Sequence, residues 1–160
     1  MEKREKTPPG ALRVIKPLLM DEDEAEEQRR LKLAQWITSK DNPLTARVMV
    51  NRIWHYVMGQ GLVRTPGDFG ANGVAPTHPL LLDWLADEFM RNDWSIKHIQ
   101  RLILNSRTFR QSSKPTPMGM DKDAGGAWLW RYTPRRLSAE PMRDGISGVA
   151  VALDKPQLSR

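Results

Sequence analysis

The sequence predicts a mainly α-helical single domain of four to five helices with one long structured loop. Apolar residues recur at three- and four-residue spacing in several stretches, and residues that start or end helices flank the strongest of them. No stretch alternates apolar and polar residues strongly enough to predict a β-sheet, and no internal repeat is found. A chain of 160 residues has the length of one domain and is long enough to bury a core.

The chain divides into a helical domain, residues 23–153, and two predicted tails. Residues 1–22 carry prolines among lysines and arginines without a sustained period, which is typical of a flexible tail, and residues 154–160 are predicted to form another. Residues 1–6 are charged, no apolar core follows them, and no apolar run approaches about 18 residues. We therefore expect neither an export signal nor a membrane span in the sequence as given.

A first helix is expected over residues 23–39. Its acidic residues gather at the start, where the positive end of the helix dipole favours negative charge. An apolar stripe follows, formed by Leu33, Trp36 and Ile37.

The strongest helix signal lies in residues 42–59. Asn42 can accept a hydrogen bond from the first-turn amides, Pro43 fits the first helical position, and Gly59 suits a left-handed C-terminal cap. One face is predicted to join the core: Ala46, Met49, Val50, Ile53 and Val57. Beside it runs a polar stripe at four-residue spacing: Arg47, Asn51 and His55.

Residues 60–78 are predicted to form the long loop. They contain four glycines, two prolines and an asparagine, which cannot sustain a helix and interrupt any paired strand. A loop of this length in a small domain is more often functional than a short one, so this loop is the preferred place for a site.

Two helices are predicted after the loop from their caps and apolar faces. Thr77 can cap the first, with Pro79 in its first turn, and Ser95 can cap the second, which ends near Arg107. The short break at residues 92–94 predicts an antiparallel or sharply angled pair.

The last part of the chain carries weaker signals. Residues 111–126 are rich in serine, proline, methionine and glycine, so a flexible connection or a disordered loop is expected. After the apolar residues 128–130, a last helix is predicted at about 137–153. One proline and two glycines weaken it, so it needs packing to persist.

Several kinds of site are excluded by composition. The chain has no cysteine, which excludes disulfides, thiolate metal sites and cysteine nucleophiles. Its three histidines, His55, His78 and His98, are never three or four residues apart, so a helical zinc pair is absent, although they could still converge in space with Asp68 or Asp83. No metal site and no cofactor is expected.

Evidence for an enzyme is weak in the sequence. No Gly-x-Ser-x-Gly elbow occurs, and the kinase-like tripeptide at residues 68–70 lacks every accompanying kinase motif, so it is interpreted as a turn with Phe69 pointing inward. A hydrolase that uses the 60–78 loop is the less favoured alternative, with His78 as the acid or base to test.

Nucleic-acid binding is the better-supported alternative. The formal net charge is +6, and the basic residues gather in the second half of the chain beside Trp130 and Tyr132. Positive charge next to aromatic rings is what phosphate and base recognition requires. The candidate residues are Arg101, Arg107, Arg110, Arg131, Arg135 and Arg136.

The chain also resembles a known family. Residues 33–39, 41–54, 61–70 and 76–79 resemble the planctomycete PSD-type domain of unknown function. The likeness continues through residues 94–97 and 108–113 to 135–137, and covers about 31–153 in order.

This resemblance implies a place in a larger protein. The family's domain resembles the C-terminal part of large exported proteins that often carry a cytochrome c-type haem domain upstream, and it supplies no catalytic residues. Two departures are visible: the family usually has a histidine pair where this chain has His55 and Tyr56, and the chain lacks the haem-attachment motif Cys-x-x-Cys-His. The resemblance also implies either a fragment that is incomplete at its C-terminal end or an unusually short member of the family.

We therefore expect a non-catalytic interaction or assembly module of a larger, extracytoplasmic multidomain protein. Its partners would be other domains of the parent protein or a separate protein; nothing in the sequence indicates an oligomeric state. The polar stripe and the long loop are predicted to meet in a binding surface composed of Arg47, Asn51, Arg64, Asp68 and His78.

Overall fold

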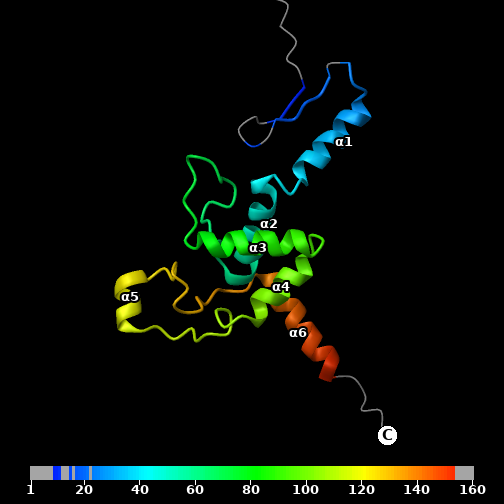
Figure 1. The fold of residues 1–160 in the computed structure, drawn as a ribbon. Coiled ribbons are helices and arrows are strands. Elements are labelled where there is room, and N and C mark those ends of the chain that lie inside the picture. Colours follow the sequence, from blue (N-terminus) through cyan, green and yellow to red (C-terminus); the bar gives the residue numbers. More distant parts are fainter. Residues whose placement is uncertain (1–8, 12–14, 16, 22, 154–160) are drawn as a thin grey trace, which may run out of the picture.

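The computed structural model describes residues 9–11, 15, 17–21 and 23–153, and this part of the chain contains six helices and no strand (Figure 1). The helices are α1 (Glu26–Ile37), α2 (Pro43–Met58), α3 (Pro79–Arg91), α4 (Ile96–Asn105), α5 (Pro117–Asp123) and α6 (Ala139–Leu153). The predicted mainly α-helical fold class is confirmed. One helix more than expected is present because α5 occupies part of the predicted flexible connection.

The predicted tails fall largely on residues that the structure does not describe. Residues 1–8, 12–14, 16, 22 and 154–160 lie outside the described part, so the two flexible tails stay predictions.

Helix α2 has the boundaries that its local chemistry predicts. The Asn42 side chain accepts a hydrogen bond from the backbone N–H of Leu44 at 3.0 Å, and Pro43 stands at the start of the helix. Gly59 ends the helix with φ = 89°, a left-handed conformation that only glycine adopts without strain.

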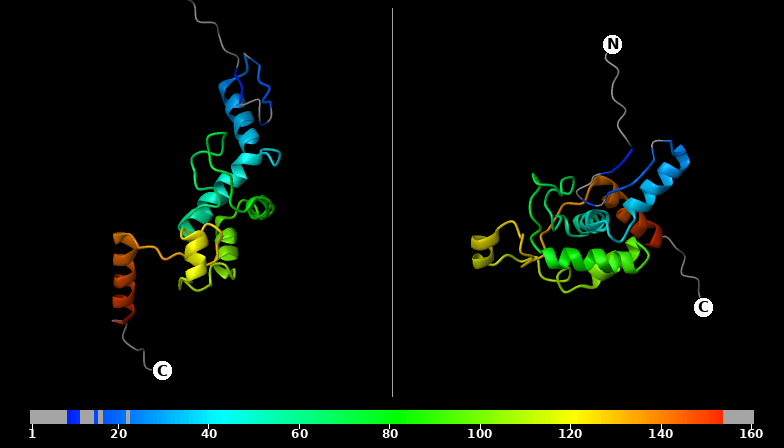
Figure 2. Two further views of the ribbon diagram at one scale, coloured as in Figure 1. Left: turned by 90° about the vertical axis from the view of Figure 1, so that its left-hand side faces the viewer. Right: turned by 45° about the horizontal axis from the view of Figure 1, so that its top comes forward.

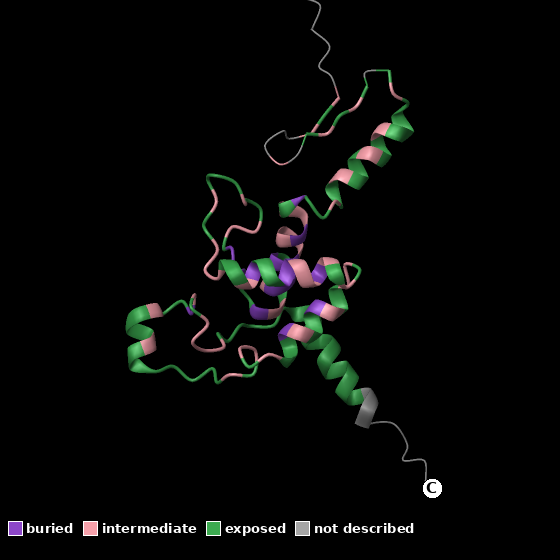
Figure 3. Ribbon diagram, in the orientation of Figure 1, coloured by how far each residue is buried: buried purple, intermediate pink, exposed green. Residues whose placement is uncertain are grey.

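The core lies where α2, α3 and α4 meet. Contacts between helices in the described residues concentrate on these three, and Figure 3 shows the buried positions gathered there. From α2, the predicted core residues Ala46, Val50 and Ile53 are buried, while Met49 and Val57 pack partly buried against them. The remaining buried apolar residues are Trp54, Met58, Leu62, Val63, Leu82, Leu85, Ala86, Phe89, Ile99 and Ile103.

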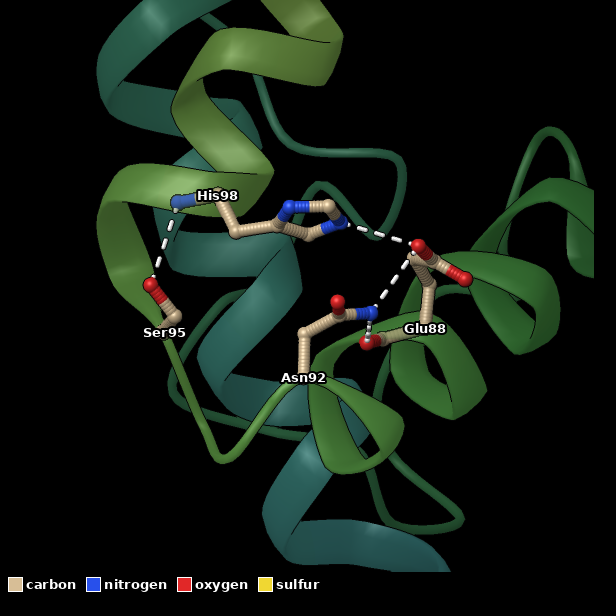
Figure 4. Close-up of polar contacts among 4 residues, drawn as sticks. All are labelled: Glu88, Asn92, Ser95 and His98. Atoms are coloured by element: carbon tan, nitrogen blue, oxygen red, sulfur yellow. Dashed lines mark hydrogen bonds and ion pairs between the residues drawn. The ribbon is translucent and has the colours of Figure 1, made fainter.

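A polar cluster fixes the junction between α3 and α4 (Figure 4). Glu88 Oε1 lies 2.8 Å from His98 Nε2 and accepts a hydrogen bond from Asn92 Nδ2 at 3.0 Å. Ser95 caps α4 as predicted, because its Oγ accepts from the backbone N–H of His98 at 3.3 Å. These contacts link the end of one helix to the start of the next.

The prediction that Thr77 caps α3 is wrong. His78 holds the N-cap position and makes no side-chain capping bond there. The Thr77 backbone N–H donates to the Leu62 carbonyl at 2.9 Å, and its hydroxyl donates to the same oxygen at 3.3 Å. Thr77 therefore closes the base of the 60–78 loop instead of starting a helix.

The 60–78 loop is ordered by hydrogen bonds to α2 and by hydrogen bonds within the loop. At its first end, the buried Asn51 side chain donates to the Val63 carbonyl at 3.0 Å and accepts from the Val63 N–H at 2.9 Å. Further along, Asp68 Oδ1 accepts from the Gly70 N–H at 2.8 Å, and the adjacent Phe69 packs partly buried against the core, as the turn interpretation predicts. The loop is thus a fixed structure joined to α2.

Helices α1 and α6 extend from this core. Helix α1 buries none of its residues, and α6 stands apart from the core in the left-hand view of Figure 2. No helix among the described residues is both long and apolar enough to span a membrane.

Candidate functional site

A cavity of about 410 Å³ lies between the C-terminal end of α2, the 60–78 loop and residues 125–135. Its charged lining consists of Arg64, Arg131 and Arg135, and His55 lies beside them. No aspartate or glutamate lines it. We call this cavity the arginine pocket. It combines Arg64, from the predicted binding surface, with Arg131 and Arg135, two candidates of the nucleic-acid alternative.

Two glycines lie beside the arginine side chains. A Cβ on Gly59 would lie 3.4 Å from Cδ of Arg135, and a Cβ on Gly125 would lie 3.6 Å from Nη2 of Arg64. The Arg135 stem therefore lies over the end of α2, and the Arg64 guanidinium lies against the backbone of the 125–135 segment.

Asp123 holds the turn that forms one wall of the pocket. Its two carboxylate oxygens accept hydrogen bonds from the backbone N–H groups of Ala127 at 3.0 Å and Trp128 at 2.8 Å. The bond from Trp128 is the largest cause that lowers the pKa of Asp123, and the Ala127 amide and the charge of Arg64 lower it further. The carboxylate thus stays ionised while it orders the turn.

The same turn is fixed further along by Leu129. This residue has φ = 57°, a left-handed backbone that is costly for a leucine. Its carbonyl accepts a hydrogen bond from Gln111 Nε2 at 2.9 Å, and its side chain packs partly buried against the core. These contacts hold the backbone in a strained conformation at the wall of the pocket.

Arg131 is held in place before any ligand arrives. Its guanidinium carbon lies 5.0 Å from the centre of the Trp130 ring, and its Nη2 donates to the Ala124 carbonyl at 3.3 Å. Its buried Nε has no hydrogen-bond partner in the described part of the chain. A guanidinium fixed by such contacts loses little side-chain entropy when it binds an anion.

The residues of the predicted binding surface do not share one cavity. Arg64 lines the arginine pocket, whereas Arg47 lines a second cavity of about 360 Å³ with Asp83. Asn51 is fully buried and bonded to Val63, and Asp68 caps a turn within the loop. That these residues bind a partner stays a prediction.

The remaining residue of that surface, His78, lies at the start of α3. Its Nδ1 lies 3.0 Å from the Thr77 hydroxyl, and its ring meets Trp128 edge-on at 5.9 Å. Among the described residues, no three histidine, aspartate or glutamate side chains gather closely enough to hold a metal ion. His98, whose Nε2 lies 2.8 Å from Glu88 Oε1, belongs to the α3–α4 junction.

The basic residues proposed for nucleic-acid binding are split between two places. Arg131 and Arg135 line the arginine pocket. The other three candidates lie outside it: Arg101 on α4, and Arg107 and Arg110 just after that helix. Arg136 is exposed beside the pocket residues.

The two rings beside these arginines are engaged within the fold. Arg131 covers Trp130, and a Cβ on Gly119 would lie only 2.6 Å from the same ring. Tyr132 meets Phe109 edge-on at 5.4 Å. Base stacking on these rings would require both to leave their present contacts.

Arg47 and Asp83 form an ion pair across α2 and α3. Arg47 Nε donates to Asp83 Oδ1 at 2.6 Å, and this bond is the main cause that lowers the pKa of Asp83 below its ordinary value of 3.8. A carboxyl with a lowered pKa stabilises the fold above its unfolded pKa, and this contribution is lost as the pH falls through the folded pKa.

Asp83→Asn should therefore lower the free energy of unfolding only at pH values where Asp83 is ionised in the parent protein. Because both side chains are partly exposed, the expected loss in unfolding free energy at pH 7 is below about 1 kcal/mol. The difference between Asp83→Asn and the parent should shrink towards zero as the pH falls below the ordinary value of 3.8. Urea titrations of both proteins at neutral and acid pH measure this; a difference independent of pH would contradict it.

The sequence did not reveal the wall residues of the arginine pocket. Asp123, Gly125 and Gly126 lie in the stretch that was expected to be flexible. The sequence does carry a signal for an ordered turn here: Asp123 is followed closely by Gly125 and Gly126. A glycine permits the left-handed φ of 66° that Gly126 adopts.

A separate feature is the unpartnered apolar face of α6. Met142, Ile146 and Val149 recur on one side of the helix and are 52%, 66% and 60% exposed. Every described side chain of this helix is exposed. We call these three residues the α6 apolar face.

Comparison with protein families places most of the chain in a match to one family model. The family model described as "PSD1: Protein of unknown function (DUF1553)" matches residues 29–159. No curated protein and no solved structure matches the chain.

Proposed function

The chain belongs to the PSD1 family of proteins of unknown function, and we propose that it is a non-catalytic interaction or assembly module of a larger, extracytoplasmic multidomain protein. The observation that carries this proposal is the α6 apolar face. The extracytoplasmic placement is supported by the resemblance to domains of large exported proteins.

Helix α6 needs a partner because it lacks the means to be stable alone. Isolated helices shorter than about 12–15 residues are marginal in water even with ideal composition. Helix α6 has 15 residues, and the two glycines in its interior, Gly145 and Gly148, lower its helix propensity further. Most helical stability in proteins comes from packing of an apolar face, and α6 has such a face without a covering element among the described residues.

The face is suited to a protein surface. A helix with apolar residues at four- and three-residue spacing fits a hydrophobic groove, with each side chain filling one hole. Another domain of the parent protein or a separate protein supplies that groove. The family resemblance offers a c-type haem domain as the first partner to examine.

Changing Ile146 to Asp should abolish this docking without changing the fold. A carboxylate in an apolar groove is costly, so capture of the partner from the native source should fall at least about tenfold. The unfolding midpoint should stay the same because Ile146 is 66% exposed. Tagged chains on beads, with captured protein quantified by mass spectrometry, measure the first quantity, and urea unfolding measures the second.

Ser147→Asp is the matched control. Ser147 is exposed on the other side of the same helix, so the new charge should leave capture within about twofold. Equal capture by the parent and Ile146→Asp would refute the proposal, as would equal loss in both variants. Recovery of nucleic acid alone, lost at moderate salt, would favour the nucleic-acid alternative instead.

A further inference from the structure

The arginine pocket carries an inference of its own, independent of the α6 apolar face. None of its three arginines forms an ion pair among the described residues, whereas Arg30, Arg47 and Arg91 elsewhere are each paired with an acid. The carboxylate of Asp123, on which the charge of Arg64 acts, offsets part of this positive charge, and an anion would offset the rest.

We propose that the arginine pocket binds a doubly charged phosphate group, either free phosphate or the phosphate of a monoester. The charge count favours two negative charges. The pocket holds three arginines, and Asp123 lies close enough for the charge of Arg64 to act on it. Three positive charges and one negative leave a net charge of two to be matched.

The donor geometry of the lining also favours phosphate over a carboxylate. A guanidinium presents a planar fork that binds two oxygens at once. A phosphate monoester offers three terminal oxygens to three such forks, whereas a carboxylate offers only two. The contacts of Arg131 with the Trp130 ring and the Ala124 carbonyl prepare one of these forks before the ligand arrives.

The rest of the cavity leaves space for more than an ion. Its volume of about 410 Å³ falls in the range of small-molecule sites. Trp54, Met58 and Leu129 contribute apolar surface, and Thr77 and Thr133 contribute hydroxyl groups. A monoester with a partly apolar body fits this lining better than a bare ion does.

Titration calorimetry at constant ionic strength tests the proposal with phenyl phosphate, phenyl sulfate, benzoate and inorganic phosphate as probes. Phenyl phosphate should bind at least about tenfold more tightly than phenyl sulfate or benzoate, which carry one charge each. Inorganic phosphate that binds as tightly as phenyl phosphate identifies the free ion as the ligand, and weaker binding identifies a monoester. Both results support the doubly charged group.

Two double variants separate the pocket from general surface charge. Arg64→Gln with Arg135→Gln should raise the Kd for phenyl phosphate at least about tenfold. Arg101→Gln with Arg107→Gln removes the same charge outside the pocket and should change the Kd less than about twofold. All four arginines are exposed, so urea unfolding should show both variants folded like the parent.

Three results would overturn the proposal. They are the absence of saturable phenyl phosphate binding below about 10 mM, equal affinity for phenyl phosphate and phenyl sulfate, and equal weakening in the two double variants. None of them bears on the α6 apolar face, which lies on a different element.

Discussion

Phe89→Ala is expected to lower the free energy of unfolding by about 3–5 kcal/mol, which is the usual cost of truncating a buried phenylalanine. Phe89 is 2% exposed and belongs to the core that α2, α3 and α4 share. Its ring also meets Trp94 edge-on at 5.2 Å, a contact that supports the left-handed backbone of Trp94 at φ = 57°. Truncation therefore opens a cavity and removes the packing that holds the α3–α4 turn.

Urea unfolding followed by tryptophan fluorescence and far-UV circular dichroism measures this loss. Leu80→Ala is the matched control, because Leu80 lies on the same helix but is 83% exposed, and it should change stability by less than about 0.5 kcal/mol. If Phe89→Ala does not fold, Phe89→Leu should still fold with a smaller loss, below that of the alanine variant. A loss under about 1.5 kcal/mol for Phe89→Ala would show that this position is not central to the core.

The parts of the fold that could be predicted from the sequence are those set by neighbouring residues. Asn42 and Gly59 mark the ends of α2 because capping is a contact between a residue and the adjacent turn. Ser95 marks the start of α4 for the same reason. The fold class followed from such local signals, which do not depend on distant parts of the chain.

The elements that were predicted wrongly depend on contacts between residues that are far apart in the sequence. Thr77 has the chemistry of a cap, but the Leu62 carbonyl takes its hydrogen bonds because the two ends of the loop meet. Helix α5 was missed because its proline and glycine indicate a break, while Thr116 caps it and Trp130 packs against Gly119. The Thr77–Leu62 and Trp130–Gly119 contacts cannot be read from spacing along the chain, whereas the Thr116 cap is a local contact.

The arginine pocket shows the same limit. Arg64 is a candidate because of the long loop and Arg131 because of the aromatic rings beside it, and nothing in the sequence connects these two signals. The Asp123 turn brings their segments together, and the sequence pattern had placed that turn in a flexible connection. Periodicity identified Asn51 as part of a polar stripe on α2, yet it could not show that the loop covers this position.

Asn51→Ala is expected to lower the free energy of unfolding by about 2–4 kcal/mol, through two hydrogen bonds lost together. The Asn51 amide donates to the Val63 carbonyl at 3.0 Å and accepts from the Val63 N–H at 2.9 Å, and both residues are buried. Alanine leaves both backbone groups of Val63 without partners and without access to water, which is the costly case for a buried polar group. Gly61 adds to this dependence, because a Cβ there would lie 2.9 Å from the Asn51 amide atoms.

Two further variants separate this hydrogen-bonded role from general effects of removing an asparagine. Asn72→Ala, at an exposed position of the same loop, should change the unfolding free energy by less than about 0.5 kcal/mol. Asn51→Asp keeps an acceptor for the Val63 N–H but loses the donor and buries a charge, so at pH 7 it should destabilise the protein at least as much as alanine does. If Asn51→Ala and Asn72→Ala cost the same, the loop is not held by Asn51. Because Arg64 follows Val63 directly, a loop released by Asn51→Ala should also weaken phenyl phosphate binding in the arginine pocket.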